Sequence, residues 1–78
     1  MDNDIYCRVR KFAHSLASTE LNDYSNVLLD DIEYANSATE ILMKLTHHMT
    51  NMLKCEKLSL NQEKSVRSML SEIEKILS

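Results

Sequence analysis

The sequence contains no glycine and no proline in its 78 residues. Turns that require a positive φ and the tight hairpins of β-sheets normally use glycine, so this absence argues against a β-rich fold. Helices joined by short polar turns need neither residue. With 44% hydrophobic and 27% charged residues, the composition is typical of a folded chain and too apolar for a disordered one. An all-α fold is therefore predicted.

Cysteine and long apolar runs are also scarce. The two cysteines, Cys7 and Cys55, are too few for the disulfide framework of a small secreted protein, and we expect both to be buried as small apolar residues. No apolar run approaches the roughly 18 residues needed to cross a bilayer. The sequence starts Met1-Asp2-Asn3-Asp4, which lacks the basic and apolar stretches of a signal peptide. We expect a cytoplasmic protein without a membrane partner.

Positive charge is absent from a long central stretch. Between Lys11 and Lys44 there is no lysine or arginine, whereas six carboxylates occur there. The formal net charge of the whole chain is −3. A protein that binds nucleic acid needs a concentrated basic face for its phosphate contacts, so this distribution argues against nucleic acid as the partner.

Apolar residues recur at helical spacing in four segments, which predict helices over about 4–17, 19–31, 37–56 and 60–77. Amphipathic helices joined by short turns pack as antiparallel neighbours. No repeat, linker or low-complexity tract divides the chain. The prediction is a single helical domain over 1–78, an antiparallel bundle of four helices.

Start signals support these boundaries. Two segments, Ser37 to Glu40 and Ser59 to Gln62, match the capping box, in which a hydroxyl and a Glu or Gln side chain satisfy each other's backbone N–H groups. Asp4 is expected to cap the first helix, and Ser18 or Thr19 the second. The third helix is expected to be the longest, with Lys54 and Lys57 at its end, where the helix dipole favours positive charge.

One cluster has the chemistry of a metal site. On a helix, His48, Met52 and Cys55 would share a face, and such ligands suit copper or zinc. A closed zinc site requires about four ligands, however, and no second cluster supplies the rest. We therefore interpret these residues as packing groups and predict no metal and no cofactor.

Catalytic groups are also weakly indicated. His14 and Ser15 lie near Cys7 in the sequence, so a nucleophile with a base can be imagined. Such a site also requires a cleft and oxyanion donors, and a thin helical domain without glycine-rich loops offers little of either. We predict a binding protein and not an enzyme.

The acidic turn before the third helix is the main candidate for a binding site. Tyr34 follows several carboxylates there, and an aromatic residue among carboxylates is typical of a contact surface for a basic partner. The alternative is a solvated acidic turn whose tyrosine closes the end of the bundle. We predict the following partner-binding residues: Asp23, Asp30, Asp31, Glu33, Tyr34 and Glu40.

The pattern of the chain resembles that of the small helical immunity proteins of bacterial polymorphic toxin systems, in particular the MafI-like type. Those proteins show a short helix ending in Leu, an acidic helix, a Glu-Tyr segment opening a long helix, and a last helix that starts with Leu-Ser. The matching residues are Ser15-Leu16, Glu20-Leu21, Leu28 to Asp31, Glu33-Tyr34, Ala38, Ile41-Leu42 and Leu58-Ser59.

This resemblance implies a protein that binds and neutralises a cognate toxin, often a nuclease, inside the producing bacterial cell. A nuclease presents a basic surface to its substrate, which an acidic inhibitor can occupy with fast association. The alternative function is a small helical adaptor, a secretion chaperone or a regulatory homodimer. A homodimer remains open because small helical domains often need association for stability.

Overall fold

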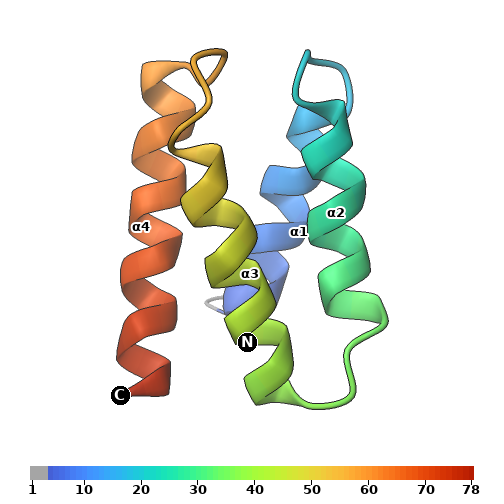
Figure 1. The fold of residues 1–78 in the computed structure, drawn as a ribbon, viewed down its shortest axis with the longest axis vertical. Coiled ribbons are helices and arrows are strands. Elements are labelled where there is room, and N and C mark those ends of the chain that lie inside the picture. The colour runs from blue at the N-terminus through green and yellow to red at the C-terminus, as the bar shows by residue number, and fades with distance from the viewer. Residues whose placement is uncertain (1–3) are drawn as a thin grey trace.

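The computed structural model describes residues 4–78, which form four helices and no strand. The helices are α1 (Ile5–Leu16), α2 (Asn22–Glu33), α3 (Ala38–Met52) and α4 (Leu60–Leu77). They run alternately up and down (Figure 1). The predicted all-α bundle of four helices is confirmed.

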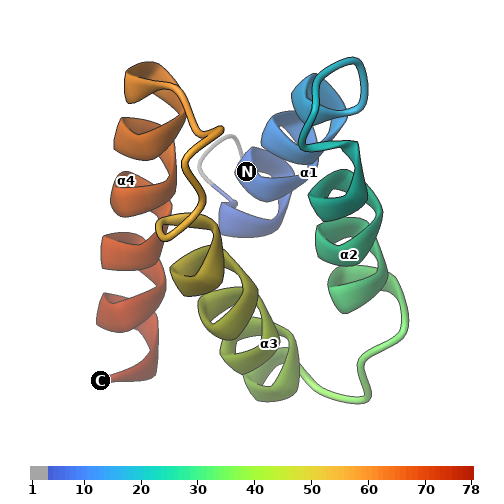
Figure 2. The same cartoon turned by 45° about the horizontal axis from the view of Figure 1, so that its top comes forward.

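The helices pack in a ring. Each helix contacts the two helices next to it, and α1 and α4 close the ring, whereas the backbones of the diagonal pairs stay apart. As a result α2 and α4 lie on opposite sides of the molecule (Figure 1). Turning the molecule shows that α3 and α4 diverge away from the loop that joins them (Figure 2). The outer face of α2 is therefore remote from the outer face of α4.

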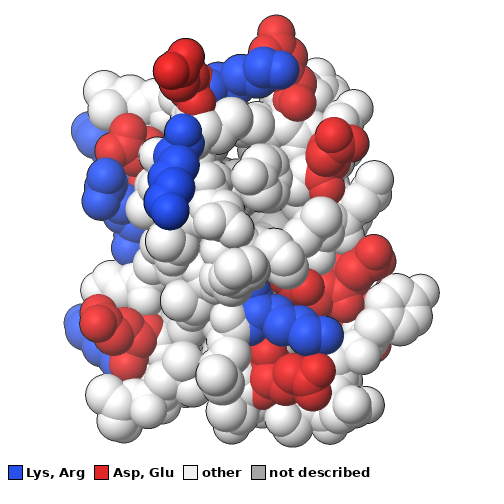
Figure 3. Space-filling model, in the orientation of Figure 1, with Lys and Arg blue, Asp and Glu red and all other residues white. Residues whose placement is uncertain are grey.

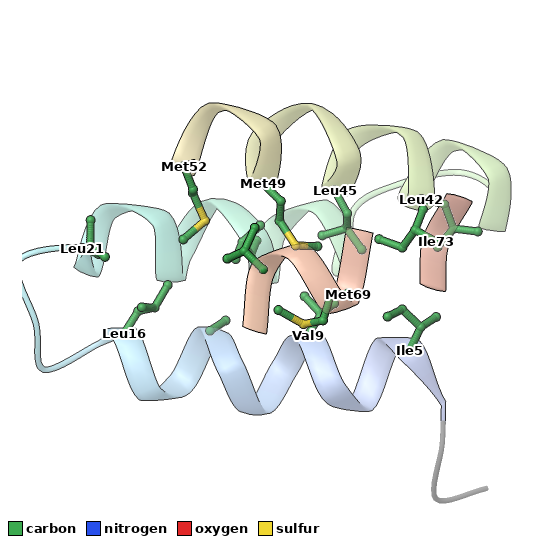
Figure 4. Close-up of a cluster of buried hydrophobic side chains, with 13 residues drawn as sticks. Ile5, Val9, Leu16, Leu21, Leu42, Leu45, Met49, Met52, Met69 and Ile73 are labelled. Atoms are coloured by element: carbon green, nitrogen blue, oxygen red, sulfur yellow. The ribbon is translucent and has the colours of Figure 1, made fainter. Parts of the chain in front are cut away.

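The core is a layer of aliphatic and methionine side chains between the helices (Figure 4). Burial of such side chains is the main stabilising term in a small domain. Within α2, Leu28 is the only fully buried apolar residue, and Tyr24, Leu29 and Ile32 are half-buried against the core. The buried apolar residues are Ile5, Val9, Ala13, Leu16, Leu21, Leu28, Leu42, Leu45, Met49, Met52, Val66, Met69 and Ile73.

The third helix is shorter than predicted, because it ends at Met52 and not near residue 56. After it, the chain tightens into turns in which Lys54 N–H donates to the Asn51 carbonyl at 3.1 Å and Cys55 N–H to the Met52 carbonyl at 2.9 Å. These turns fold Leu58 back against the core. The prediction that lysines occupy the last helical turn is therefore wrong, and α4 is the longest helix.

The second helix begins at Asn22, three residues later than predicted. The Thr19 hydroxyl does not cap it directly. Instead, it accepts from Leu21 N–H at 3.0 Å and donates to the Leu16 carbonyl at 2.8 Å, which forms a turn between α1 and α2. Short polar side chains often stabilise such turns in place of a helical cap.

Three of the other predicted caps form. Asp4 accepts from Tyr6 N–H at 2.9 Å, and the reciprocal capping box of Ser59 and Gln62 is complete. Ser37 accepts from Glu40 N–H at 3.1 Å, but the Glu40 carboxylate accepts from Asn36 N–H and not from Ser37. The box at α3 is therefore only half formed.

Two other sequence features can be placed. Cys7 and Cys55 are free thiols and only half-buried, so the expectation that both are fully buried is wrong. Among the helices of residues 4–78, none combines the length and the apolarity that a membrane span requires.

Candidate functional site

The outer face of α2 is the acidic surface of the molecule. Asp23 and Asp30 are seven residues apart, so they share a face of the helix about 10 Å apart along its axis, and Glu33 extends this face. All three side chains are exposed. Figure 3 shows acidic groups along the edge over α2, with one basic side chain beside the acidic groups near the lower end of this edge and another at the top of the molecule. We call the residues Asp23, Asp30, Glu33 and Tyr34 the acidic face.

The carboxylates of the acidic face are not neutralised from within the described part of the chain. No Lys, Arg or His of residues 4–78 forms an ion pair with Asp23, Asp30 or Glu33. The helix itself contains no basic residue. The negative charge therefore remains available to a partner.

Tyr34 stands at the end of this face. It is the C-cap residue of α2, and its N–H donates to the Asp30 carbonyl at 2.9 Å, which places it one turn after Asp30. Its side chain is 69% exposed. A hydrogen bond to Glu33 and the negative charges of Glu33 and Asp30 raise the pKa of Tyr34 above its ordinary value. The negative charge of the acidic face therefore makes the Tyr34 phenol harder to deprotonate.

Neutralising Glu33 is expected to lower the pKa of Tyr34. The Glu33 carboxylate opposes the negative phenolate, so Glu33→Gln should move the pKa back towards that of an ordinary tyrosine. The measurement is a spectrophotometric titration of the phenolate, with Tyr34→Phe used to assign the signal among the three tyrosines. An unchanged pKa in Glu33→Gln would show that Glu33 does not act on the phenol.

Asp31, which was predicted to contact a partner, lies inside the protein. It is 6% exposed, and its Oδ2 lies 2.5 Å from Nδ1 of His48 on α3. Position 31 is three residues after Leu28 on the inward stripe of the helix, so its side chain faces α3 and not solvent. Asp31 is therefore a link between two helices and does not belong to the acidic face.

Glu40, the other outlying member of the predicted set, belongs to the start of α3. It accepts from Asn36 N–H at 3.2 Å and pairs with Lys44 at 3.3 Å, and these contacts, the backbone one first, lower the pKa of Glu40. Because the pKa of Glu40 is lower in the folded protein, its ionised carboxylate stabilises the fold at pH values above the ordinary glutamate pKa. This stabilisation is lost as the pH falls through the lowered pKa of Glu40. Because Lys44 offsets its charge, Glu40 adds little to the acidic face.

Sequence reasoning thus placed four of the six residues together and missed the role of His48. The available signal was the helical period: Ser25, Leu28 and Asp31 recur every three residues, and all three are buried. A carboxylate on a buried stripe requires a partner. The sequence gives no means of choosing among the three histidines, because that choice depends on how α3 packs.

The candidate metal ligands are dispersed. His48 contacts Asp31, Met52 is fully buried, and Cys55 lies beyond the end of α3. Within residues 4–78 no group of three or more His, Cys, Asp or Glu side chains is arranged to hold an ion. What the acidic face offers chemically is an array of exposed hydrogen-bond acceptors beside one aromatic ring.

Comparison of the chain with protein-family models, with curated proteins and with solved structures finds no match.

Proposed function

We propose that this protein acts by binding, as an immunity protein that neutralises a cognate bacterial toxin through the acidic face of α2. The observation that carries the proposal is the set of exposed carboxylates at Asp23, Asp30 and Glu33 without an ion pair in residues 4–78, beside the exposed Tyr34. The toxin is expected to present lysines and arginines at its own active surface, as a nuclease does.

Electrostatics favours this kind of partner. Carboxylates on a convex surface attract a cationic protein over a Debye length of about 8 Å at physiological ionic strength and steer its approach. A nucleic acid would be repelled by the same charges. Tyr34 supplies the apolar area that charge alone lacks, because tyrosine is among the residues that most often contribute a large share of the binding energy at interfaces.

Reversing one charge of the acidic face is expected to weaken capture of the partner. Asp30→Lys and Glu33→Lys should each raise the dissociation constant by about tenfold, mainly through slower association, and more at low salt. The experiment uses tagged wild type and variants as baits in a lysate of the producing cell, followed by mass spectrometry and by association kinetics with the captured protein. Neither side chain is buried, so the fold should be retained.

The matched control is Glu56→Lys, the same reversal at an exposed residue of the loop between α3 and α4. It should bind like wild type. The captured protein should be basic, and it should be toxic when expressed alone but harmless with wild type. A partner that binds Asp30→Lys and Glu33→Lys as tightly as Glu56→Lys would rule out the acidic face. A captured partner that is not toxic would rule out the immunity role.

A further inference from the structure

The loop between α2 and α3 contains the only asparagine of residues 4–78 that lies outside a helix (Figure 1). Asn36 and the next residue, Ser37, are both exposed, and Ser37 is the N-cap of α3. The other asparagines of residues 4–78 belong to helices: Asn22, Asn26, Asn51 and Asn61. Asn36 is therefore the asparagine whose backbone the fold restrains least.

Two groups of this residue pair are left without a hydrogen-bond partner. Among residues 4–78, nothing pairs with the side-chain amide of Asn36 and nothing accepts from Ser37 N–H. The contacts that do form lie on either side of these groups: Asn36 N–H donates to the Glu40 carboxylate at 3.2 Å, and the Ser37 hydroxyl accepts from Glu40 N–H at 3.1 Å. Turning the side-chain amide of Asn36 towards the nitrogen of Ser37 therefore costs at most an exposed hydrogen bond.

We propose that Asn36 and Ser37 form a site of spontaneous deamidation. The backbone nitrogen of Ser37 attacks Cγ of Asn36, and the side-chain amide leaves as ammonia, carrying away the proton that the Ser37 nitrogen gives up. The product is a five-membered succinimide ring, whose closure is fast for an intramolecular attack because the two atoms belong to neighbouring residues. Water then opens the ring at either carbonyl and leaves aspartate or isoaspartate at position 36.

The asparagines of α2 are protected against the same reaction. A helix holds ψ near about −42°, and the ring closes only after ψ turns the next nitrogen towards Cγ, so the helix must open first. Asn26 is followed by Val27, whose branched side chain also crowds the nitrogen. Asn22 is followed by Asp23, whose carboxylate opposes the negative charge that develops on the attacking nitrogen. At Ser37, in contrast, the positive end of the α3 dipole favours that charge.

The reaction changes the charge of the loop. Aspartate at position 36 adds a negative charge two residues after Tyr34 and extends the negative charge of the acidic face. The same charge lies at the start of α3, where the helix dipole stabilises it. Isoaspartate instead lengthens the main chain by one carbon atom directly before the N-cap Ser37. The acidity of this end of the molecule therefore rises as the protein ages, and this inference does not depend on the proposed function.

Peptide mapping tests the proposal within a single fragment. Because no lysine or arginine lies between Lys11 and Lys44, trypsin releases residues 12–44 as one peptide that contains Asn22, Asn26 and Asn36. After incubation of the folded protein in mildly alkaline buffer, mass spectrometry should find conversion at position 36 at least about tenfold faster than at position 26, since only local opening of α2 exposes Asn26 to attack. Chromatography should separate two products, one with aspartate and one with isoaspartate.

Asn36→Gln should abolish the main product, because glutamine would have to close a larger ring. Asn26→Gln is the matched control, the same substitution at an exposed residue of α2, and it should retain the wild-type rate. In urea, where the helices are unfolded, the gap between positions 36 and 26 should narrow. The proposal would be overturned by a folded protein that forms no acid at position 36, by equal rates at positions 36 and 26, or by aspartate without isoaspartate. A gap that urea leaves unchanged would overturn it as well.

Discussion

His48→Ala is expected to lower the free energy of unfolding by about 2 kcal/mol, a large part of the about 3–5 kcal/mol that a domain of this size possesses. The ring N–H at Nδ1 of His48 donates to the carboxylate of Asp31, which is 6% exposed. Without the ring, that carboxylate is left without its only side-chain partner among residues 4–78, in a position that water reaches poorly. The measurement is urea unfolding followed by circular dichroism.

His47→Ala is the matched control, since it changes the neighbouring histidine of the same helix. His47 is exposed; its ring makes a long contact of 3.5 Å with Asn51 and lies edge-to-face against the ring of His48 with the centroids 5.3 Å apart, a contact that both substitutions remove. Both substitutions gain the same small amount of helix propensity, so the difference between them isolates the contact with Asp31. We expect His47→Ala to stay within about 0.5 kcal/mol of wild type. Equal losses in the two variants would contradict a stabilising role of the contact.

A second variant separates the contact from the volume of the ring. In Asp31→Ala/His48→Ala the unpaired carboxylate is absent as well, so the double variant should be at least as stable as His48→Ala alone. A lower stability of the double variant would show that Asp31 has another stabilising contact. The result bears on function too, because Asp31 and His48 join α2 to α3 and so fix the orientation of the acidic face.

The fold was predictable because each helix carries its own periodic signal and because no glycine or proline interrupts it. The errors lie at helix ends. The apolar stripe of the third helix continues to Leu53, but the turns after Met52 use backbone carbonyls that a longer helix would have used internally. The start of the second helix was predicted too early because the Thr19 hydroxyl hydrogen-bonds within the turn between α1 and α2 and does not cap a helix. Where a helix begins or ends can depend on a single hydrogen bond, which does not alter the spacing of apolar residues in the sequence.

The site was predictable only in part, for a related reason. The absence of lysine and arginine between residues 11 and 44 is visible in the sequence, and it led to Asp30 and Glu33. Charge counting does not distinguish a carboxylate on the outer face of a helix from its neighbour on the inner face. Asp30 and Asp31 are adjacent in sequence, but one is exposed and the other is buried against His48. The pairing of Glu40 with Lys44 is a helical spacing of four, which could have been anticipated.

Met49→Ala is expected to lower the free energy of unfolding by about 3 kcal/mol, enough to leave part of the population unfolded at room temperature. Met49 is fully buried on α3 and lies within the core formed by all four helices (Figure 4). Its truncation leaves a cavity that the surrounding leucines fill only partly, because packed side chains lose their dispersion contacts across a gap. Thermal unfolding followed by circular dichroism measures the loss.

Met43→Ala is the matched control on the same helix, because Met43 is 61% exposed. It should change stability by less than about 0.5 kcal/mol, since alanine has a slightly higher helix propensity and little apolar area is lost. The pair therefore distinguishes methionines that fill the core from one that could adapt to a partner. If Met43→Ala destabilised the protein as much as Met49→Ala, the exposed position of Met43 would be wrong. The outer surface of α3 would then have to pack against something.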